Sequence, residues 1–379
     1  MISYFKPDLG QEEKNAVNGV IDSGWLTTGK VCSKFESLFL KKFGLDNLYS
    51  CAVNSNTSGL QLCIESFNFE NGSEVIVPSM TYTASAGAIV SSKMKPVITD
   101  VNEDNLLTAE IIKKHITKKT VAVLLVHFAG KTCEMDPIID LCKENHIKII
   151  EDCAHSLPSK YSNGEWVGSY GNPCVFSFYA NKTMTTGEGG MIICKDKDFY
   201  DELVIKRNHG IDRNVFDRFS GNSKKWDYDV VKHGFKFNLP DISAALGIVQ
   251  LEKLFDAQKK RDRIAKKYRQ FHLENNDIFF TSLPNGNGIH SYHLFQISSK
   301  IKCREFREKL IKEFDKKGVG YSAHYKPLHV MPYWKNYIEN DAFPNSTAHF
   351  EASLSLPIYP SLNDTDIDLI NTIISSIKI

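Results

Sequence analysis

The sequence predicts an α/β fold built on a mostly parallel β-sheet, with a smaller α+β region toward the C-terminus. Short apolar runs alternate with amphipathic, helix-like stretches through the first half of the 379 residues, and this alternation is typical of parallel sheets. The composition, with 42% hydrophobic and 24% charged residues, is sufficient for a large hydrophobic core. Polar and glycine-rich segments follow several apolar runs, which is where such sheets bind ligands.

The elements of the first half follow from the hydrophobic pattern. A helix is expected at 11–22, and further helices at 60–67 and 109–115, because each has apolar residues at three- and four-residue spacing. The expected strands are the short apolar runs 49–53, 74–78, 96–100, 121–127, 148–152, 173–178 and 191–194. The marked polar residues then fall at strand ends, at 54–59, 81–82, 127 and 152–155.

The pattern changes after about residue 240. A long helix is expected at 241–274, where an apolar stripe is followed by a charged segment that is typical of a solvated helix face. The remaining expected elements are a strand at 293–297 and helices at 304–317 and 364–377. We therefore predict a large domain over 1–250 and a smaller C-terminal domain over 251–379.

Charge and cysteine content exclude several classes of protein. The net charge is +1 without a basic block, so neither nucleic acid nor a membrane surface is an expected partner. No apolar run approaches the roughly 20 residues of a membrane span, and the N-terminal residues lack the apolar core of a signal peptide. The nine cysteines form no CxxC pair, which favours reduced, buried thiols in a cytoplasmic protein over disulfides or a metal site.

Lys182 carries the most informative signal. It lies in the run Phe-Ser-Phe-Tyr-Ala-Asn-Lys-Thr-Met-Thr-Thr-Gly-Glu-Gly-Gly at 176–190, and Asp152 ends a predicted buried strand thirty residues earlier. An enzyme that uses pyridoxal phosphate needs both groups, because the lysine amine forms a Schiff base with the aldehyde and the carboxylate keeps the pyridine nitrogen protonated. For an isolated lysine, a surface residue in a polar loop would be the better interpretation.

A phosphate site is expected where the strand 49–53 leads into a helix. Free amides at a helix N-terminus bind anions, and Thr57 and Ser58 are the natural side-chain ligands there. Taken alone, the same residues would fit an ordinary serine or threonine N-cap. Ser177, five residues before Lys182, could also reach the phosphate.

Two further residues follow predicted strands. Tyr82 could stack on a flat cofactor ring, although an ordinary core tyrosine is the alternative. His155 could hydrogen-bond the cofactor's ring hydroxyl beside Asp152, whereas the alternative is a structural Asp–His pair. A metal site is less favoured, because no third ligand follows at a useful spacing. Lys182, once displaced by a substrate amine, could carry the proton between the substrate and cofactor carbons.

These motifs resemble the DegT/DnrJ/EryC1/StrS family of sugar aminotransferases, which have the aspartate aminotransferase fold (fold type I). The resemblance covers nearly the whole chain. It is carried by the segments 23–29 (Ser-Gly-Trp-Leu-Thr-Thr-Gly), 78–82, 126–136, 151–155 (Glu-Asp-Cys-Ala-His), 176–190, 207–210, 234–241, 291–295, 324–329 and 356–357.

The resemblance implies a large domain with a seven-stranded mostly parallel sheet, and a homodimer with active sites at the subunit interface. It implies that Thr57, Ser58 and Ser177 bind phosphate, Tyr82 stacks on the ring, and Asp152 and His155 contact the ring nitrogen and hydroxyl. Lys182 would be the Schiff-base residue. Lys236 or Asn238 of the partner subunit would reach the phosphate, and a pocket for the nucleotide-linked sugar would be lined by Trp25, Thr27, Thr28, His324 and His329.

The sequence departs from the family pattern at two places. Asn56 stands where many members have glycine, and Tyr82 where many have tryptophan or phenylalanine; neither change prevents cofactor binding. A branch of the family carries histidine in place of the lysine and dehydrates sugars, and Lys182 argues against that branch. Arg207, Arg213 and Arg218 are candidates for anion contacts, with surface salt bridges as the alternative.

The implied activity is a transamination. An amino acid, L-glutamate by family analogy, converts the cofactor to pyridoxamine phosphate, and a nucleotide-diphospho-4-keto sugar then accepts the amine at C4 in amino sugar or surface polysaccharide synthesis. Amination at C3 is the alternative within the family. Sugar deoxygenation, desulfuration, or a regulatory protein that keeps the fold are more distant alternatives.

Overall fold

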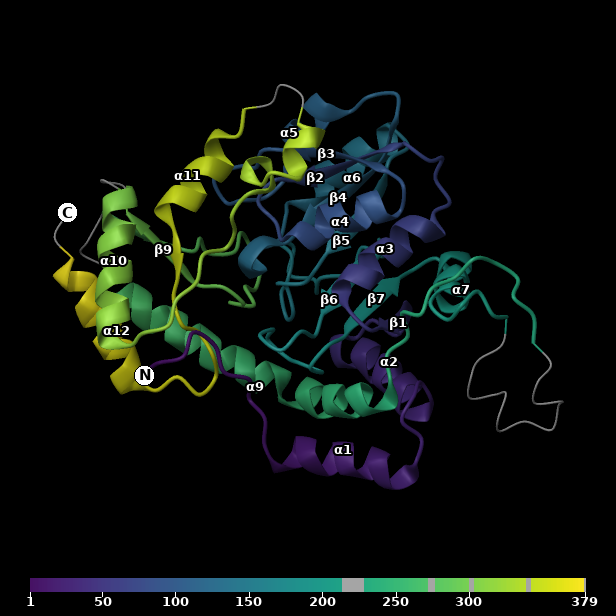
Figure 1. Cartoon of the computed structure of the whole chain (residues 1–379), viewed down its shortest axis with the longest axis horizontal. Coiled ribbons are helices and arrows are strands. Elements are labelled where there is room, and N and C mark those ends of the chain that lie inside the picture. Colours follow the sequence, from purple (N-terminus) through teal and green to yellow (C-terminus); the bar gives the residue numbers. More distant parts are fainter. Residues whose placement is uncertain (213–227, 272–276, 300–302, 339–341, 378–379) are drawn as a thin grey trace.

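The structure, a computed structural model, describes residues 1–212, 228–271, 277–299, 303–338 and 342–377. Its centre is a seven-stranded sheet with the strand order β1-β7-β6-β5-β4-β2-β3 (Figure 1). β7 is antiparallel to both of its neighbours, β1 and β6, and the other pairs are parallel. The predicted seven-stranded, mostly parallel sheet is therefore confirmed.

The strands lie where the apolar runs predict them, with shifts of one residue at some ends. The short apolar runs suit buried strands of a parallel sheet, which are apolar on both faces. Their bounds are β1 Tyr49–Val53, β2 Glu74–Pro78, β3 Lys95–Thr99, β4 Thr120–Val126, β5 Lys148–Asp152, β6 Cys174–Ser177 and β7 Gly190–Cys194.

Helices cover both faces of the sheet. Alternate strand residues explain this, because Val123 and Leu125 of β4 belong to one apolar cluster and Leu124 belongs to the other. The first face is covered by α2 (Lys30–Phe43), α5 (Ala109–His115), α6 (Met135–Glu144) and α9 (Asp241–Phe271). The second face is covered by α3 (Asn56–Ser66), α4 (Thr83–Ser91) and α7 (Lys197–Lys206). α1 (Gln11–Ser23) packs along α9.

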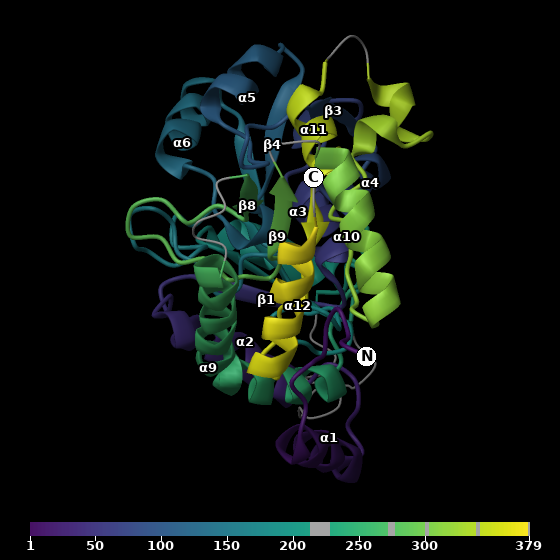
Figure 2. The ribbon, with the colours of Figure 1, turned by 90° about the vertical axis from the view of Figure 1, so that its left-hand side faces the viewer.

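The C-terminal part has its own sheet and core. β8 (Ile278–Phe280), β9 (Gln296–Ser299) and β10 (Leu354–Ser355) form a three-stranded antiparallel sheet. α10 (Cys303–Lys317), α12 (Asp364–Ser376) and the end of α9 pack around a third apolar cluster. Figure 1 shows α10 and α12 together at one end of the molecule, and Figure 2 is the view from that end. The remaining elements are α11 (Pro344–Ala352) and the short 3-10 helices η1 (Phe128–Gly130), η2 (Leu328–Val330) and η3 (Trp334–Tyr337).

The expected strand at 293–297 begins later, at Gln296, because residues 290–294 form a loop that is anchored to η1, the segment that follows β4. The long helix predicted at 241–274 is α9, although residues 272–274 lie outside the described part. α9 runs through residue 250 without interruption, and the domain boundary there stays a prediction.

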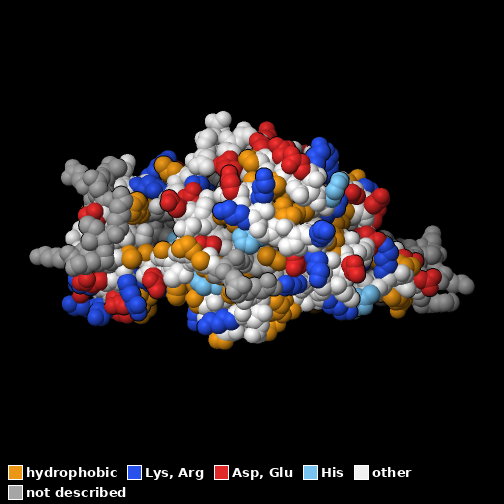
Figure 3. Space-filling view, turned by 90° about the horizontal axis from the view of Figure 1, so that it is seen from above, with side chains coloured by type: hydrophobic (Ala, Val, Ile, Leu, Met, Phe, Trp, Pro, Cys, Tyr) orange, Lys and Arg blue, Asp and Glu red, His pale blue; other side chains and the backbone are white. Residues whose placement is uncertain are grey.

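The surface and the thiols agree with the composition. Acidic and basic side chains are interspersed over the face seen in Figure 3. Eight of the nine cysteines are buried, Cys303 is partly exposed, and all nine are free thiols. Within the described residues, no helix has the length and apolar character that a membrane-spanning segment requires.

Candidate active site

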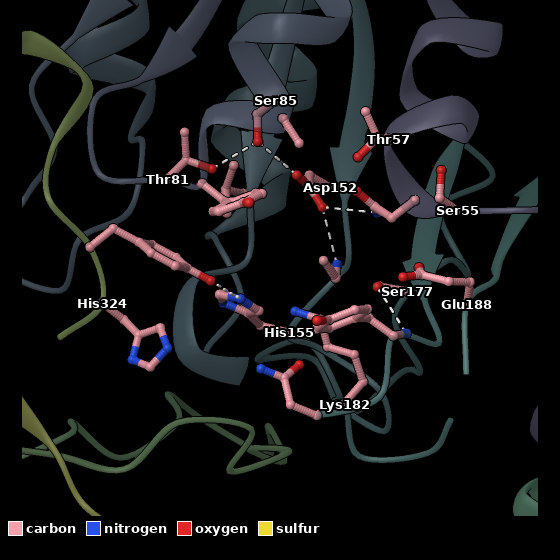
Figure 4. A pocket seen from close by; sticks show the side chains of 18 of the residues that line it. Ser55, Thr57, Thr81, Ser85, Asp152, His155, Ser177, Lys182, Glu188 and His324 are labelled. Atoms are coloured by element: carbon pink, nitrogen blue, oxygen red, sulfur yellow. Dashed lines mark hydrogen bonds between the residues drawn. The ribbon is translucent and has the colours of Figure 1, made fainter. Parts of the chain in front are cut away.

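A cavity of about 430 Å³ lies at the carboxyl ends of the central strands. Its walls come from the segments that follow β1, β2, β5 and β6, as expected for a ligand site in a parallel sheet. The loop that precedes η2 contributes a further wall. Among the residues predicted from the sequence, the cavity is lined by Thr57, Tyr82, Asp152, His155, Ser177, Lys182 and His324. Figure 4 labels all of these except Tyr82.

Asp152 is the buried carboxylate of the cavity, with an exposed fraction of 4%. Its Oδ1 accepts hydrogen bonds from Asn56 Nδ2 and the Ala154 backbone N–H, both at 3.1 Å, and its Oδ2 accepts one from Ser85 Oγ at 2.9 Å. Burial raises the pKa of Asp152, while these donors and the charge of Lys182 oppose that rise. The carboxylate therefore has a fixed orientation and an electrostatic need for a cationic partner.

Lys182 lies in the turn after β6, where its backbone N–H donates to the Tyr179 carbonyl at 3.0 Å. Its Nζ is 3.4 Å from Nε2 of His293. Burial lowers the pKa of Lys182 to about 8, against the opposing charge of Asp152. An appreciable fraction of this amine is thus unprotonated near neutral pH, as a nucleophile or a proton acceptor must be.

His155 is held by hydrogen bonds from both ring nitrogens. Nδ1 accepts the Ala129 N–H at 3.2 Å, so the ring proton sits on Nε2 and is donated to the Tyr325 hydroxyl at 2.8 Å. Burial, together with the charge of Lys182, holds the pKa of His155 well below its usual range, which agrees with a neutral ring. The Tyr325 hydroxyl therefore takes the Nε2 hydrogen bond of His155, the residue expected to contact the cofactor's ring hydroxyl, and its own O–H remains for a ligand.

Part of the segment between β1 and α3 lines the cavity, where the phosphate site was expected. Ser55 is the N-cap of α3 and accepts the Ser58 N–H, while Thr57 lines the cavity and Ser177 faces it from β6. The Ser58 hydroxyl lies outside the cavity lining, because it donates to Asn54 Oδ1 at 2.6 Å. Free amides of the first helical turn, Thr57 and Ser177 thus converge, as a phosphate site requires.

Tyr82 is 60% exposed although it lines the cavity. Its ring lies 5.8 Å from the ring of Tyr325, tilted by 50°. This exposure argues against the ordinary core tyrosine, and it leaves an aromatic face available to a flat ligand.

Five other predicted residues do not line this cavity: Trp25, Thr27, Thr28, Lys236 and Asn238. Asn238 Nδ2 donates to Thr28 Oγ1 at 2.6 Å, and Trp25 Nε1 donates to the Thr28 carbonyl at 3.4 Å. The Thr27 carbonyl accepts a hydrogen bond from the Asp241 N–H, and the Lys236 carbonyl accepts one from Asn54 Nδ2. Their predicted roles therefore need a binding surface other than this cavity.

His329 also lies outside the cavity lining. Its ring nitrogens contact Ser79 Oγ at 2.8 Å and Thr347 Oγ1 at 3.0 Å, and the ring stacks on Phe343. These contacts describe a residue that fastens the loop around η2 to the large sheet.

His127 lies at the end of its strand as expected, but its side chain is buried in the core. Its Nδ1 accepts the Cys133 N–H at 3.1 Å and its Nε2 bonds Glu151 at 2.9 Å. The Tyr161 hydroxyl donates to the same carboxylate. His127, Glu151 and Cys153 lie close enough to hold a metal ion, but both histidine nitrogens are already engaged within the protein.

Arg207 is a buried partner of Glu36, at 2.6 Å, and it also donates to the Ala52 carbonyl. It therefore stabilises the fold beneath β1 and does not face the cavity. Arg213 and Arg218 lie outside the described residues.

Among the residues that were not predicted, Asn56, Ser85 and Tyr325 line the cavity and hydrogen-bond a predicted residue, and His293 contacts Lys182. The departure at Asn56 was a usable signal, because a larger polar side chain in place of glycine needs a partner. Ser85 and Tyr325 lie within three residues of sequence positions that were singled out. Nothing in the spacing of His293 pointed to Lys182, which is 111 residues away.

Comparison with known proteins places this geometry in context. A model of the DegT/DnrJ/EryC1/StrS aminotransferase family matches residues 7–375. Over 374 residues the chain is 34% identical to the spore coat polysaccharide biosynthesis protein SpsC of Bacillus subtilis, with 97% of this chain and 94% of that protein covered.

Solved structures agree over almost the full length. The putative sugar aminotransferase Spr1654 from Streptococcus pneumoniae, in its PMP form, matches with a TM-score of 0.91 and 29% identity over 99% of this chain and 98% of that chain. A PLP form of the same protein has also been solved. Helicobacter pylori PseC, an aminotransferase involved in the biosynthesis of pseudoaminic acid, matches with a TM-score of 0.90 and 27% identity over 99% and 98%.

Proposed function

The chain belongs to the DegT/DnrJ/EryC1/StrS aminotransferase family, and from this premise we propose that it transfers an amino group from L-glutamate to C4 of a nucleotide-linked 4-keto sugar. As a family member it is a pyridoxal phosphate-dependent sugar aminotransferase. SpsC and PseC act in polysaccharide and pseudoaminic acid biosynthesis, which supports a role in making an amino sugar, in surface polysaccharide synthesis.

One observation carries the proposal: Lys182 and Asp152 line the same cavity. The buried carboxylate has an electrostatic need for a cation, and the lysine amine has a lowered pKa. These two properties fit a ligand with a protonated ring nitrogen at one end and a reactive aldehyde beside the amine. The cavity residues therefore fit pyridoxal phosphate.

When bound, pyridoxal phosphate supplies an aldehyde that takes up the amino group, giving pyridoxamine phosphate, and a ring that accepts the electron pair released at the donor carbon. Asp152 would hold the proton on the ring nitrogen, because its three hydrogen bonds point its oxygens in fixed directions. Thr57, Ser177 and the first turn of α3 would bind the phosphate, and Tyr82 would cover the ring.

Lys182 would move the proton in both half-reactions. In the first, its amine would take the proton from the α-carbon of glutamate and pass it to the former aldehyde carbon of the cofactor, and the donor would leave as 2-oxoglutarate. In the second, the amine would take a proton back from that cofactor carbon and pass it to the former keto carbon of the sugar. The amino group and the carbonyl oxygen are exchanged between the two substrates, so the overall reaction balances without a further reactant.

We further propose that the enzyme is a homodimer with shared active sites. Lys236 and Asn238 do not line the cavity of their own chain, so a contact with the phosphate would have to come from the partner subunit. Trp25, Thr27 and Thr28 lie beside Asn238 and would act from the same neighbouring surface on the nucleotide-linked sugar. His324 lines the cavity and could contact the sugar directly, whereas a contact from His329 would require the loop around η2 to move.

The first test is the absorbance of the protein saturated with pyridoxal phosphate, before and after L-glutamate is added. We expect a band near the visible edge that is replaced by a pyridoxamine-like band, and formation of 2-oxoglutarate. Lys182→Ala is the control, and it should abolish the conversion while leaving the fold intact. Conversion at the wild-type rate by Lys182→Ala would refute the assigned role of the lysine.

The second test is the sugar. The pyridoxamine form is mixed with nucleotide-diphospho-4-keto and 3-keto sugars that differ in nucleotide and stereochemistry, and the position of the new C–N bond is read by NMR. Amination at C4 is the expected result. Turnover of the 3-keto sugars alone would replace the proposal with a C3 aminotransferase.

A further inference from the structure

His293 is the residue in hydrogen-bond contact with the amine of Lys182 in the described part of the chain. Nε2 and Nζ are 3.4 Å apart. His293 is 6% exposed, and its ring packs against the ring of His155 with centroids 4.5 Å apart. This contact places a second histidine beside the lysine, although His293 does not line the cavity itself.

The loop that carries His293 is fastened to the large domain. The Leu294 N–H donates to the Ala129 carbonyl at 3.2 Å, and the Ser291 hydroxyl donates to the His155 carbonyl. His155 and Ala129 are themselves joined by the hydrogen bond described above. The position of His293 relative to Lys182 is therefore defined by the same backbone segments that position His155.

The ring proton of His293 can be assigned from its surroundings. Nδ1 is buried and has no hydrogen-bond partner among the described residues. A buried N–H without an acceptor is rarer than an acceptor without a donor, so the proton belongs on Nε2. Nε2–H then points at Nζ, and a nitrogen can accept this hydrogen bond only if it has a free lone pair. The partner is therefore the neutral amine of Lys182, and not its ammonium form.

We propose that His293 is a positioning residue that donates a hydrogen bond to the unprotonated amine of Lys182 and so holds this amine ready to react whenever it is free. The inference rests on the role proposed for Lys182, and it adds a residue to which the reaction scheme above gives no part. The amine is free before the cofactor is captured and again between the two half-reactions.

The other groups that face Lys182 do not supply this contact. Asp152 on β5 raises the pKa of the lysine through its charge. His155 and His324 are kept neutral because burial lowers the pKa of each ring, that of His324 to about 3. Arg261 on α9 and the Lys182 charge lower the pKa of His293 itself, after burial as the main cause. A neutral His293 beside a neutral amine is consistent with all of these charges.

The decisive measurement is the rate at which cofactor-free protein captures pyridoxal phosphate, followed by absorbance as a function of pH. Capture needs the neutral amine, so the rate should rise through the pKa of Lys182, about 8. In His293→Phe the hydrogen-bond donor is lost while Lys182 stays buried. The midpoint, which is the pH of half-maximal capture rate, should then rise by about one pH unit. His293→Gln can donate from a similar position and should return the midpoint close to the wild-type value.

The titration of the cofactor is common to all variants, so differences between their midpoints report on the protein. His290→Phe is the matched control: His290 is also buried with one unpartnered ring nitrogen, but it is not in hydrogen-bond contact with Lys182. If His293→Phe does not fold, His293→Met provides a flexible side chain without a donor.

An unchanged or lowered midpoint in the donor-free variants would overturn the inference, because an accepting His293 would stabilise the ammonium form instead. Failure of the underlying role of Lys182 would look different. In that case Lys182→Ala would capture the cofactor with the same spectrum as the wild-type protein, whatever residue stands at 293.

Discussion

The side-chain amide of Asn56 donates a hydrogen bond to the carboxylate of Asp152 at 3.1 Å, across 96 residues of sequence. The same amide donates to the Val175 carbonyl at 2.7 Å. It therefore joins the first turn of α3, at the proposed phosphate site, to β5 and β6, where the carboxylate and the lysine turn begin. A residue that departs from the glycine common in the family thus links both ends of the proposed cofactor site.

Asn56→Ala is predicted to weaken cofactor binding. A hydrogen bond to a charged group contributes about 1.5–3 kcal/mol, and part of it should be lost when the carboxylate is no longer held toward the ring nitrogen. We expect the dissociation constant of pyridoxal phosphate to rise by about tenfold, measured by titration of the cofactor-free protein. Ser66→Ala, at the far end of the same helix and with an unpartnered hydroxyl, is the control. Equal affinities for wild type and Asn56→Ala would contradict the role of this amide.

Asp152→Asn is predicted to lower turnover without lowering the stability of the fold. The asparagine oxygen can accept from Asn56 and Ala154, and its NH₂ can donate to the Ser85 hydroxyl, so the fold should be kept. Burial raises the pKa of Asp152, which means that the ionised group costs stability at neutral pH. The melting temperature of the cofactor-free protein should therefore be unchanged or higher, while turnover falls on the order of a hundredfold or more. A stable variant with full turnover would remove Asp152 from the mechanism.

The sequence predicts the strands that position the site much better than the side-chain contacts within the site. β1, β2 and β5 have the predicted bounds because each is a compact apolar run, and residues that follow parallel strands must meet at one edge of the sheet. Lys182 and Asp152 could therefore be paired in advance. Side chains that are far apart in the sequence and hydrogen-bond each other follow no such local pattern. Nothing local distinguishes His293, which reaches Lys182, from His329, which instead fastens a loop to Ser79.

The lowered pKa of Lys182 predicts how stability depends on pH in the absence of cofactor. Burial lowers this pKa from 10.5 to about 8, so between these values the unfolded chain binds more protons and stability rises with pH. The cost of burying the ammonium is fully present below pH 8, and is roughly 3 kcal/mol at about 1.4 kcal/mol per pKa unit.

Lys182→Met should remove that cost. We expect the cofactor-free variant to be more stable than wild type at pH 7, and this difference to shrink by pH 9.5, as measured by urea unfolding at both pH values. A stability difference that stays constant across this range would show that the lysine titrates normally.

The His155–Tyr325 pair should appear as an energetic coupling. Tyr325→Phe leaves the buried Nε2–H of His155 without its acceptor, which costs about 1–3 kcal/mol. In His155→Leu this donor is absent, so the same tyrosine change should cost less. Unfolding of the two single variants and the double variant should give a coupling of about 0.5–3 kcal/mol, whereas additive effects would mean that the hydrogen bond does not contribute in solution.

The proposed shared active site can be tested with two inactive variants. Lys182→Ala removes the reacting amine, and Lys236→Glu places a negative charge where the partner subunit would meet the cofactor phosphate. In a mixed dimer, one site combines both changes and is inactive. The other site combines an intact Lys182 from one subunit with an intact Lys236 from the other, and it should be active.

Co-expression of the two chains with different tags gives this mixed dimer, and random pairing should restore about one quarter of the wild-type activity to the mixture. The purified mixed dimer should have about half the activity of the wild-type dimer, because one of its two sites is complete. Co-expressed Lys182→Ala chains with the two tags are the control, since they contain no intact amine. If Lys236 instead served the cavity of its own chain, every site would carry one change, and neither the mixture nor the purified mixed dimer would regain activity.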